Sequence, residues 1–194
     1  MKVAVLDHGM GNMRSVAKAL EAAGARATLI SDPRAVGAMD ALCLPGQGVF
    51  DRCMASLSDG GGEVLIREWI EADRPFLGIC LGMQVLFDVS EEHGPSKGLG
   101  ILSGKVTRLP ATVTVPHIGW NTVSAADGER PEYYYFDHSF AVHPSDCSIV
   151  DGWCEHGERF AARLNRGSVT AVQFHPEKSG RAGIDLLRKW MSAA

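Results

Sequence analysis

The first half of the chain alternates between short apolar runs and stretches in which apolar residues recur at helical spacing. Uninterrupted apolar or β-branched runs, typical of strands that a parallel sheet buries on both faces, occupy residues 2–6, 25–30 and 40–44. Apolar side chains three or four positions apart, typical of amphipathic helices, occupy residues 13–23, 49–57 and 62–72. Short glycine-containing turns separate these segments, so this half predicts a mostly parallel central sheet flanked by helices.

A further strand and helix are predicted around residue 80. Phe76, Leu77 and Ile79 form a short apolar run, which indicates one more buried strand. From Leu81 to Asp88 the apolar residues follow one another at intervals of three or four, which predicts a helix.

The pattern changes after residue 104. Short alternating or β-branched runs, typical of antiparallel strands, lie at residues 105–109, 112–115, 133–136, 148–153 and 160–164. An apolar strand at 168–174 and a helix at about 181–191 follow. No linker rich in Pro, Ser or charge divides the chain. We therefore predict one α/β domain, residues 1–194, with an antiparallel extension or second sheet in its C-terminal half.

Composition narrows the classes of protein that fit this pattern. The 194 residues carry a net charge of −4 without a block of like charge, so we expect neither nucleic-acid binding nor a membrane-surface helix. No apolar run approaches the roughly 20 residues of a spanning helix, and the apolar start is too short for a signal peptide. The five cysteines lack CxxC spacing, which argues against a zinc site or a disulfide scaffold and favours a reducing cytoplasm.

Cys80 stands where the predicted strand meets the following helix. Gly78 and Gly82 flank it two residues away on either side, the small-x-nucleophile-x-small pattern of a nucleophile elbow with cysteine in place of serine. A side chain at either flanking position would collide with the neighbouring strand or helix. The helix start favours the thiolate form of such a sulfur. The alternative is a small apolar cysteine at the end of a core strand, the interpretation we give to Cys43, Cys53, Cys147 and Cys154.

His175, Pro176 and Glu177 form the second constellation. A carboxylate two residues after a histidine in an extended segment can lie on the same side and hold the imidazole in one tautomer. By itself the pattern also fits a strand-end histidine beside a surface glutamate. Together with Cys80 it supplies the nucleophile, base and orienting group of acyl transfer. Parallel strands present their carboxyl ends at one edge, so the 95 positions between Cys80 and His175 are no obstacle.

The turn containing Gly9 and Gly11 admits two interpretations. It follows a strand and opens a helix, as a dinucleotide-binding turn does. The third glycine of that fingerprint would fall at position 14, which is Arg14, and the expected acidic residue is missing. The pattern favours a tight turn at the rim of the site.

These motifs resemble those of the triad-type, or class I, glutamine amidotransferases. The match rests on Gly78-Ile79-Cys80-Leu81-Gly82-Met83-Gln84 and His175-Pro176-Glu177. Further stretches are similar to the family of glutaminase subunits of imidazole glycerol phosphate synthase, and they lie at residues 7–12, 44–48, 116–121, 135–140 and 173–179. The likeness covers essentially the whole chain and implies a flavodoxin-like fold and a role in histidine biosynthesis.

The resemblance implies a mechanism. Cys80 attacks the side-chain amide of glutamine, His175 transfers protons and Glu177 orients His175. Leu81 and the loop Gly46, Gln47 and Gly48 supply the N–H donors of the oxyanion hole, from a peptide that glycines allow to reorient. Gln84, Ser139 and Phe140 hold the amino acid end of the substrate. No cofactor and no metal are implied.

The resemblance also implies a heterodimer, because ammonia released to water at neutral pH would be protonated. The partner is a (β/α)8-barrel cyclase subunit that makes imidazole glycerol phosphate and AICAR. We expect the contact positions to be Met10, Asn12, Trp120, Asn121, Tyr135 and Lys178. For Trp120 the alternative is a core aromatic, and for Lys178 a solvated charge. The flexible loop suggests that the free chain is a poor glutaminase, activated when the barrel binds its substrate.

Three positions depart from the family pattern, and three other functions stay open. The departures are His8, Gln47 and Asp137, where family members usually carry Tyr, Val and an apolar residue. One other function is that of a glutaminase subunit in pyridoxal phosphate, purine or anthranilate synthesis. A stand-alone cysteine hydrolase and a non-enzymatic binding domain are the remaining two.

Overall fold

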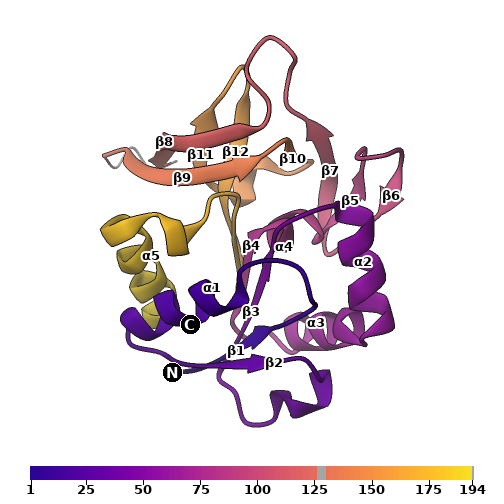
Figure 1. Ribbon diagram of the computed structural model, residues 1–194, viewed down its shortest axis with the longest axis vertical. Coiled ribbons are helices and arrows are strands. Elements are labelled where there is room, and N and C mark those ends of the chain that lie inside the picture. The colour runs from indigo at the N-terminus through magenta and orange to yellow at the C-terminus, as the bar shows by residue number, and fades with distance from the viewer. Residues whose placement is uncertain (126–129, 194) are drawn as a thin grey trace.

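The computed structural model describes residues 1–125 and 130–193, and a nine-stranded sheet runs through this part of the chain. Its strand order is β2-β1-β3-β4-β13-β12-β11-β8-β9 (Figure 1). The parallel strands are β1 (Lys2–Leu6), β2 (Arg26–Ile30), β3 (Ala41–Gly46), β4 (Phe76–Cys80) and β13 (Val169–Val172). The antiparallel extension consists of β12 (Arg159–Arg166), β11 (Val150–Glu155), β8 (His117–Ala125) and β9 (Glu132–His138).

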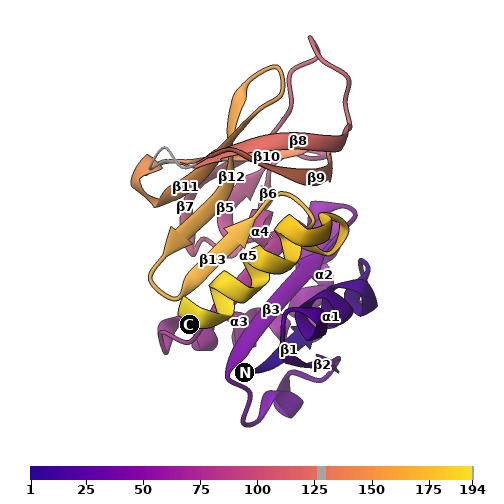
Figure 2. The ribbon, with the colours of Figure 1, turned by 90° about the vertical axis from the view of Figure 1, so that its left-hand side faces the viewer.

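Helices cover both faces of the parallel strands. On one face lie α1 (Met13–Ala22) and α5 (Gly180–Ala193), and on the other α2 (Phe50–Asp59) and α3 (Gly62–Glu71) (Figures 1 and 2). Alternate residues of β1 enter two core clusters: Val3 and Val5 pack on the α1–α5 side, Ala4 and Leu6 on the α2–α3 side. Burial of both faces explains why the parallel strands read as uninterrupted apolar runs.

A second, four-stranded sheet packs against the first in the C-terminal half. Its order is β10 (Phe140–Pro144), β7 (Leu102–Arg108), β5 (Phe87–Ser90) and β6 (Ser96–Lys97). Buried Phe87, Val106 and Val142 join the α2–α3 cluster, so both sheets share one core. The predicted α/β class with a second sheet is confirmed. This sheet is not wholly antiparallel, however, because β5 and β7 pair in parallel. Short 3-10 helices occupy Pro33–Val36 (η1), Cys147–Ile149 (η2) and Pro176–Lys178 (η3).

The helix predicted from Leu81 to Asp88 is wrong beyond its first turn. Helix α4 spans only Leu81–Gln84, and the chain then enters β5. The carbonyl of Val85 accepts from the Leu99 amide at 2.8 Å, and that of Leu86 from the Ile101 amide at 2.8 Å. Carbonyls that bind distant amides cannot continue a helix, so tertiary pairing outweighs the local spacing.

The β-rich half contains the other differences. Residues 112–115 form no strand, because Pro110 and Pro116 flank a turn in which the Val113 amide donates to the Pro110 carbonyl at 3.3 Å. Strands β8 and β10 were not predicted as strands. In β8 the usual burial of apolar side chains is reversed, because the apolar residues Ile118 and Trp120 are 60% and 56% exposed. Across residues 1–125 and 130–193, no helix is long and apolar enough to cross a membrane.

Candidate active site

The turn from β4 into α4 gives Cys80 an unusual backbone. Its φ of 53° lies in the left-handed region, a backbone conformation that residues other than glycine rarely adopt. Such strained residues are found mainly at functional turns. A Cβ at Gly78 would lie 2.7 Å from the Gly82 carbonyl oxygen, and a Cβ at Gly82 would collide with the Leu44 carbonyl oxygen. Both flanking positions therefore require glycine, as the elbow pattern predicts.

His175 follows β13, the strand beside β4. Parallel pairing of Val172 with Ile79 brings the end of β13 next to Cys80. His175 Nδ1 lies 2.8 Å from Glu177 Oε1, and each of these two side chains is only 3% exposed. Within the described part of the chain, the second ring nitrogen of His175, Nε2, is buried without a hydrogen-bond partner. One imidazole nitrogen is thus held by a carboxylate and the other is free to take up a proton.

Charge around His175 favours its protonated form. Burial alone would lower the pKa of His175, but the sulfur of Cys80 and the carboxylate of Glu177 outweigh it and raise this pKa. A base that gains affinity for a proton beside a thiol is suited to deprotonating that thiol.

The other cysteines lack these surroundings. All five thiols are free, and only Cys147 is exposed. Burial raises the pKa of the Cys53 thiol to about 12 and likewise that of Cys154. Burial raises the pKa of Cys43 as well, with a smaller contribution from Glu177. Thiols that stay protonated are poor nucleophiles, so these positions are structural.

Gln173 belongs to the site, although it was not predicted as a site residue. It is fully buried, and its Nε2 lies 3.6 Å from Cys80 Sγ. Its Oε1 accepts a hydrogen bond from Gln84 Nε2 at 3.1 Å. The available signal was a polar side chain two residues before His175 at the end of an otherwise apolar run.

Gln84 and Phe140, expected to bind substrate, meet in the structure. Gln84 Nε2 donates to the Phe140 carbonyl at 2.9 Å, and this oxygen also lies 2.9 Å from His138 Nδ1. Ser139 precedes Phe140, and its carbonyl accepts from the Leu109 amide at 2.9 Å. These bonds tie the segment to α4 and to the residue that follows β7.

A chain of three histidines in contact with one another, His138, His117 and His156, lies next to this segment. His138 Nε2 lies 3.0 Å from His117 Nδ1, and His117 stacks on His156 with ring centroids 3.9 Å apart. Burial lowers the pKa of His138 to about 3 and that of His117 to about 4, so both are neutral at pH 7. Among the residues that the structure describes, no group of three His, Cys, Asp or Glu side chains could hold a metal.

The loop expected to complete an oxyanion hole lies beside Cys80. Gly46, the last residue of β3, pairs with Cys80 in the sheet, and a Cβ on it would lie 2.9 Å from that of Leu81. Gly48 has a φ of 125°, which favours glycine. Gln47 between them is half-buried.

Three of the expected partner contacts lie together on and beside β9. The rings of Trp120 and Tyr135 meet edge to face with centroids 6.2 Å apart, and Lys178 Nζ lies 5.5 Å from the Tyr135 ring. Trp120 is no core residue, since more than half of it is exposed. A serine anchors this group, because Ser179 Oγ accepts from the Tyr135 amide at 3.0 Å and donates to the His175 carbonyl at 2.6 Å.

The other three expected contacts lie apart from this group or are engaged internally. The side chain of Met10 lies next to Gly48. Asn12 caps α1, because its side-chain oxygen accepts from the Ser15 amide at 3.3 Å. Asn121 donates to the Glu155 carbonyl at 2.9 Å and lies 3.2 Å from His117 Nε2. Its amide therefore has a structural role inside the β-rich half.

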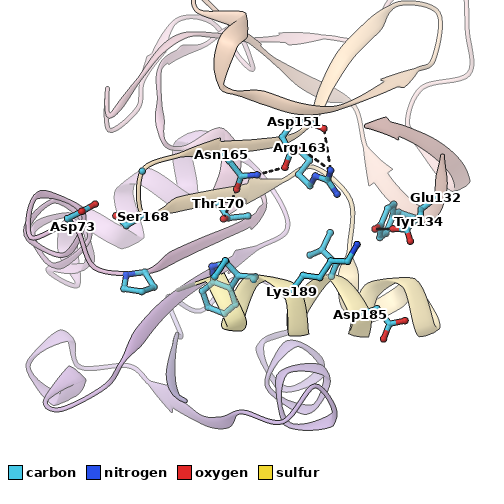
Figure 3. A pocket seen from close by; sticks show the side chains of 15 residues that line it. Asp73, Glu132, Tyr134, Asp151, Arg163, Asn165, Ser168, Thr170, Asp185 and Lys189 are labelled. Atoms are coloured by element: carbon cyan, nitrogen blue, oxygen red, sulfur yellow. Dashed lines mark hydrogen bonds and ion pairs between the residues drawn. The ribbon is translucent and has the colours of Figure 1, made fainter. Parts of the chain in front are cut away.

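A cavity of about 690 Å³ lies between α5 and strands β9, β11, β12 and β13 (Figure 3). Asp151 occupies its wall and pairs with Arg163 at 2.7 Å and with Asn165. None of the described residues that line it is a cysteine or histidine. The cavity lacks a nucleophile beside a base, so we place the chemistry at Cys80 instead.

Comparisons with known proteins show the family to which this chain belongs. Residues 4–193 match the family described as "Glutamine amidotransferase class-I". The chain is 44% identical to the imidazole glycerol phosphate synthase subunit HisH of Aquifex aeolicus, over 100% of this chain and 98% of the relative. It is 43% identical to the protein of the same name from Corynebacterium glutamicum, over 98% and 97%. A crystal structure of a glutamine amidotransferase, 21% identical over 98% and 97% of the two chains, has the same fold with a TM-score of 0.80.

Proposed function

Because the chain belongs to the class I glutamine amidotransferase family, we propose that it is the glutaminase subunit of an imidazole glycerol phosphate synthase in histidine biosynthesis. Cys80, His175 and Glu177 are its catalytic residues. The observation that carries this proposal is the buried His175–Glu177 pair beside a cysteine on a strained elbow. Full-length identities of 40–44% to HisH proteins favour this synthase over amidotransferases of other pathways.

The reaction proceeds by covalent catalysis. His175 Nε2 takes the proton of the Cys80 thiol, and the sulfur attacks the side-chain carbonyl carbon of glutamine. The C–N bond breaks, and His175 returns the proton to the leaving nitrogen, which departs as ammonia. Water, deprotonated by His175, then hydrolyses the thioester to glutamate and regenerates the thiol.

Glu177 acts through His175. Its Oε1 accepts from Nδ1–H, which fixes the tautomer that leaves Nε2 facing the sulfur, and its charge stabilises the imidazolium. The backbone N–H of Leu81 and one N–H of the loop at residues 46–48 stabilise the negative oxygen of the tetrahedral intermediate. The Phe140 segment and Gln84 hold the amino acid end of glutamine.

A partner subunit receives the ammonia. We propose that this partner is a (β/α)8-barrel cyclase and that it docks over Trp120, Tyr135 and Lys178. The exposed apolar side chains of Ile118, Trp120 and Tyr133, at 56–62% exposure, support a docking surface on β8 and β9. Free thiols at all five cysteines are consistent with a reducing cytoplasm as the place of this reaction.

The test compares two nitrogen sources in the assembled complex. Wild type releases glutamate from glutamine and supports cyclisation with glutamine or with an ammonium salt. Cys80→Ala lowers glutamate release by at least about 1,000-fold and abolishes glutamine-dependent cyclisation, but leaves ammonium-dependent cyclisation intact. Full glutaminase activity in Cys80→Ala would disprove the mechanism. Glutaminase activity that is equal with and without the substrate-loaded partner would instead favour a stand-alone hydrolase.

A further inference from the structure

Gln173 is an enclosed polar side chain directly after β13. It is fully buried, and its backbone amide donates to the Ala162 carbonyl of β12 at 2.9 Å. Its side-chain Nε2 lies 3.6 Å from Cys80 Sγ. Among the described residues, this sulfur is the only hydrogen-bond partner of Nε2. Buried polar groups are nearly always hydrogen-bonded, so this nitrogen depends on the nucleophile for its contact.

A neighbouring amide fixes which end of the Gln173 side chain faces the sulfur. The backbone carbonyl of Phe140 can only accept, so Gln84 must turn its Nε2 toward this carbonyl, 2.9 Å away. The same nitrogen lies 3.1 Å from the nearer end of the Gln173 amide, which must therefore be the acceptor Oε1. A flipped Gln173 would place two N–H groups against each other. Its Nε2, with two hydrogens, is thus directed at Cys80.

The row of hydrogen bonds continues beyond the Phe140 carbonyl. His138 Nδ1 lies 2.9 Å from this oxygen and so carries a hydrogen. Neutral His138 then accepts at Nε2 from His117 Nδ1 at 3.0 Å, and His117 accepts at Nε2 from the Asn121 side chain at 3.2 Å. Every donor in this row points the same way as far as the carbonyl. The carbonyl is therefore held in place from the side opposite Gln84.

An N–H directed at a sulfur favours its anion. A thiol sulfur is a weak acceptor, whereas a thiolate carries a full negative charge and forms a charge-assisted hydrogen bond. A donor that binds the charged form more strongly shifts the equilibrium toward that form. His175 changes its protonation state during the reaction, but the amide of Gln173 keeps its hydrogens throughout.

We propose that Gln173 is a further catalytic residue, whose side-chain N–H stabilises the Cys80 thiolate before it attacks and again when it leaves the thioester. Gln84 is a positioning residue that acts through Gln173 by holding its amide in the donating orientation. Gln84 keeps its own side-chain oxygen for the substrate. This inference rests on the proposed glutaminase function and adds a residue to the same site.

Alkylation of Cys80 by iodoacetamide measures this effect without glutamine. Gln173→Met keeps the length of the side chain and removes the donor, while His175 and Glu177 remain in both proteins. A hydrogen bond to a charged acceptor changes an equilibrium by about tenfold. The pH midpoint of Cys80 alkylation should therefore rise by about one unit, and below the wild-type midpoint the reaction should be about tenfold slower. Peptide mass spectrometry follows each cysteine separately, and exposed Cys147 should react equally in both proteins.

Kinetics of the assembled complex provide the second readout. Gln173→Met should lower kcat/KM for glutamine by about tenfold on the acid limb of its pH profile. Cyclisation with an ammonium salt should be unchanged, because it does not use Cys80. Thr170→Val is the matched control on the same strand: it removes the hydrogen bond from Thr170 Oγ1 to Asn165 Oδ1 at 2.8 Å and should leave both readouts as in wild type.

A measurement on the unaltered chain decides the matter if Gln173→Met does not fold. In wild type labelled with nitrogen-15, the side-chain amide resonance of Gln173 should shift with the pH midpoint of Cys80 alkylation, and Cys80→Ala should abolish this shift.

Three results would overturn the role of Gln173. They are an unchanged Cys80 alkylation profile in folded Gln173→Met, equal slowing at Cys80 and Cys147, and a Gln173 resonance that does not follow Cys80. Failure of the proposed function would look different: wild type would release no Cys80-dependent glutamate, whereas alkylation and the amide resonance would still report the contact.

Discussion

The elbow at Cys80 and the loop beside it lie next to each other but are held in different ways. At the elbow, backbone atoms of Gly78, Gly82 and Leu44 approach so closely that no Cβ fits. At the loop, side-chain hydrogen bonds from His8 and Gln47 hold the chain, with glycine on either side of residue 47. Close backbone packing leaves one arrangement, whereas side-chain contacts of modest energy leave others accessible. The backbone at Cys80 is thus fixed, and the loop beside it is adjustable.

Alanine at a glycine of each region gives the largest contrast. Gly82→Ala places a Cβ against the Leu44 carbonyl and should lower the free energy of unfolding by about 4 kcal/mol or more, or prevent folding. Gly48→Ala meets only the flexible end of Met10, so its cost is mainly the φ of 125°, about 1–3 kcal/mol. Chemical denaturation measures both. Equal losses in the two variants would remove the distinction between the regions.

Glu177→Gln tests whether a correctly placed nucleophile is sufficient. The elbow stays intact, but the neutral amide no longer fixes the tautomer of His175 or stabilises its positive charge. We expect kcat to fall by roughly 100- to 10,000-fold, with the fold and its denaturation midpoint nearly unchanged. Steady-state kinetics of the complex and circular dichroism measure the two quantities. A kcat within threefold of wild type would show that the elbow alone activates Cys80.

The smallest expected effect is the change in the free energy of unfolding with pH that arises from the chain of three histidines. Like the loop at residue 47, these histidines are held by side-chain contacts. Burial lowers the pKa of His138 to about 3, whereas the unfolded chain binds this proton near pH 6.5. The unfolded state therefore holds more protons between these values, and the stability that neutral His138 maintains is lost as the pH falls below about 6.5. The loss is at most about 1.4 kcal/mol per pH unit.

Substitution of this histidine separates its contribution from that of other titrating groups. Denaturant unfolding between pH 6 and pH 4.5 should show a shallower decline of stability in His138→Phe than in wild type. Parallel declines in the two proteins would mean that His138 does not titrate on unfolding. Gly78 and Gly82 carry no ionisable side chain, so the packing of the elbow should be insensitive to pH over this range.

The sequence was most informative where local pattern and buried environment agree. Apolar runs such as residues 2–6 predicted the parallel strands, and the glycine spacing around Cys80 predicted the elbow. The prediction of a helix from Leu81 to Asp88 was wrong because amides far along the chain bind the Val85 and Leu86 carbonyls. Strand β8 was not predicted because apolar Trp120 lies on its exposed face. Gln173 and His138 were not identified because their roles depend on neighbours far along the chain.

By itself the sequence determined the fold class and the residue types of acyl transfer, since periodicity and glycine spacing are local properties of the chain. Only the tertiary structure decided which polar groups far apart in the sequence meet: the amide of Gln173 at the Cys80 sulfur, and the side chain of Gln47 at that of Asp137. Those contacts join residues from different strands and loops. Their partners are chosen by how the sheet brings strand ends together, which no local pattern contains.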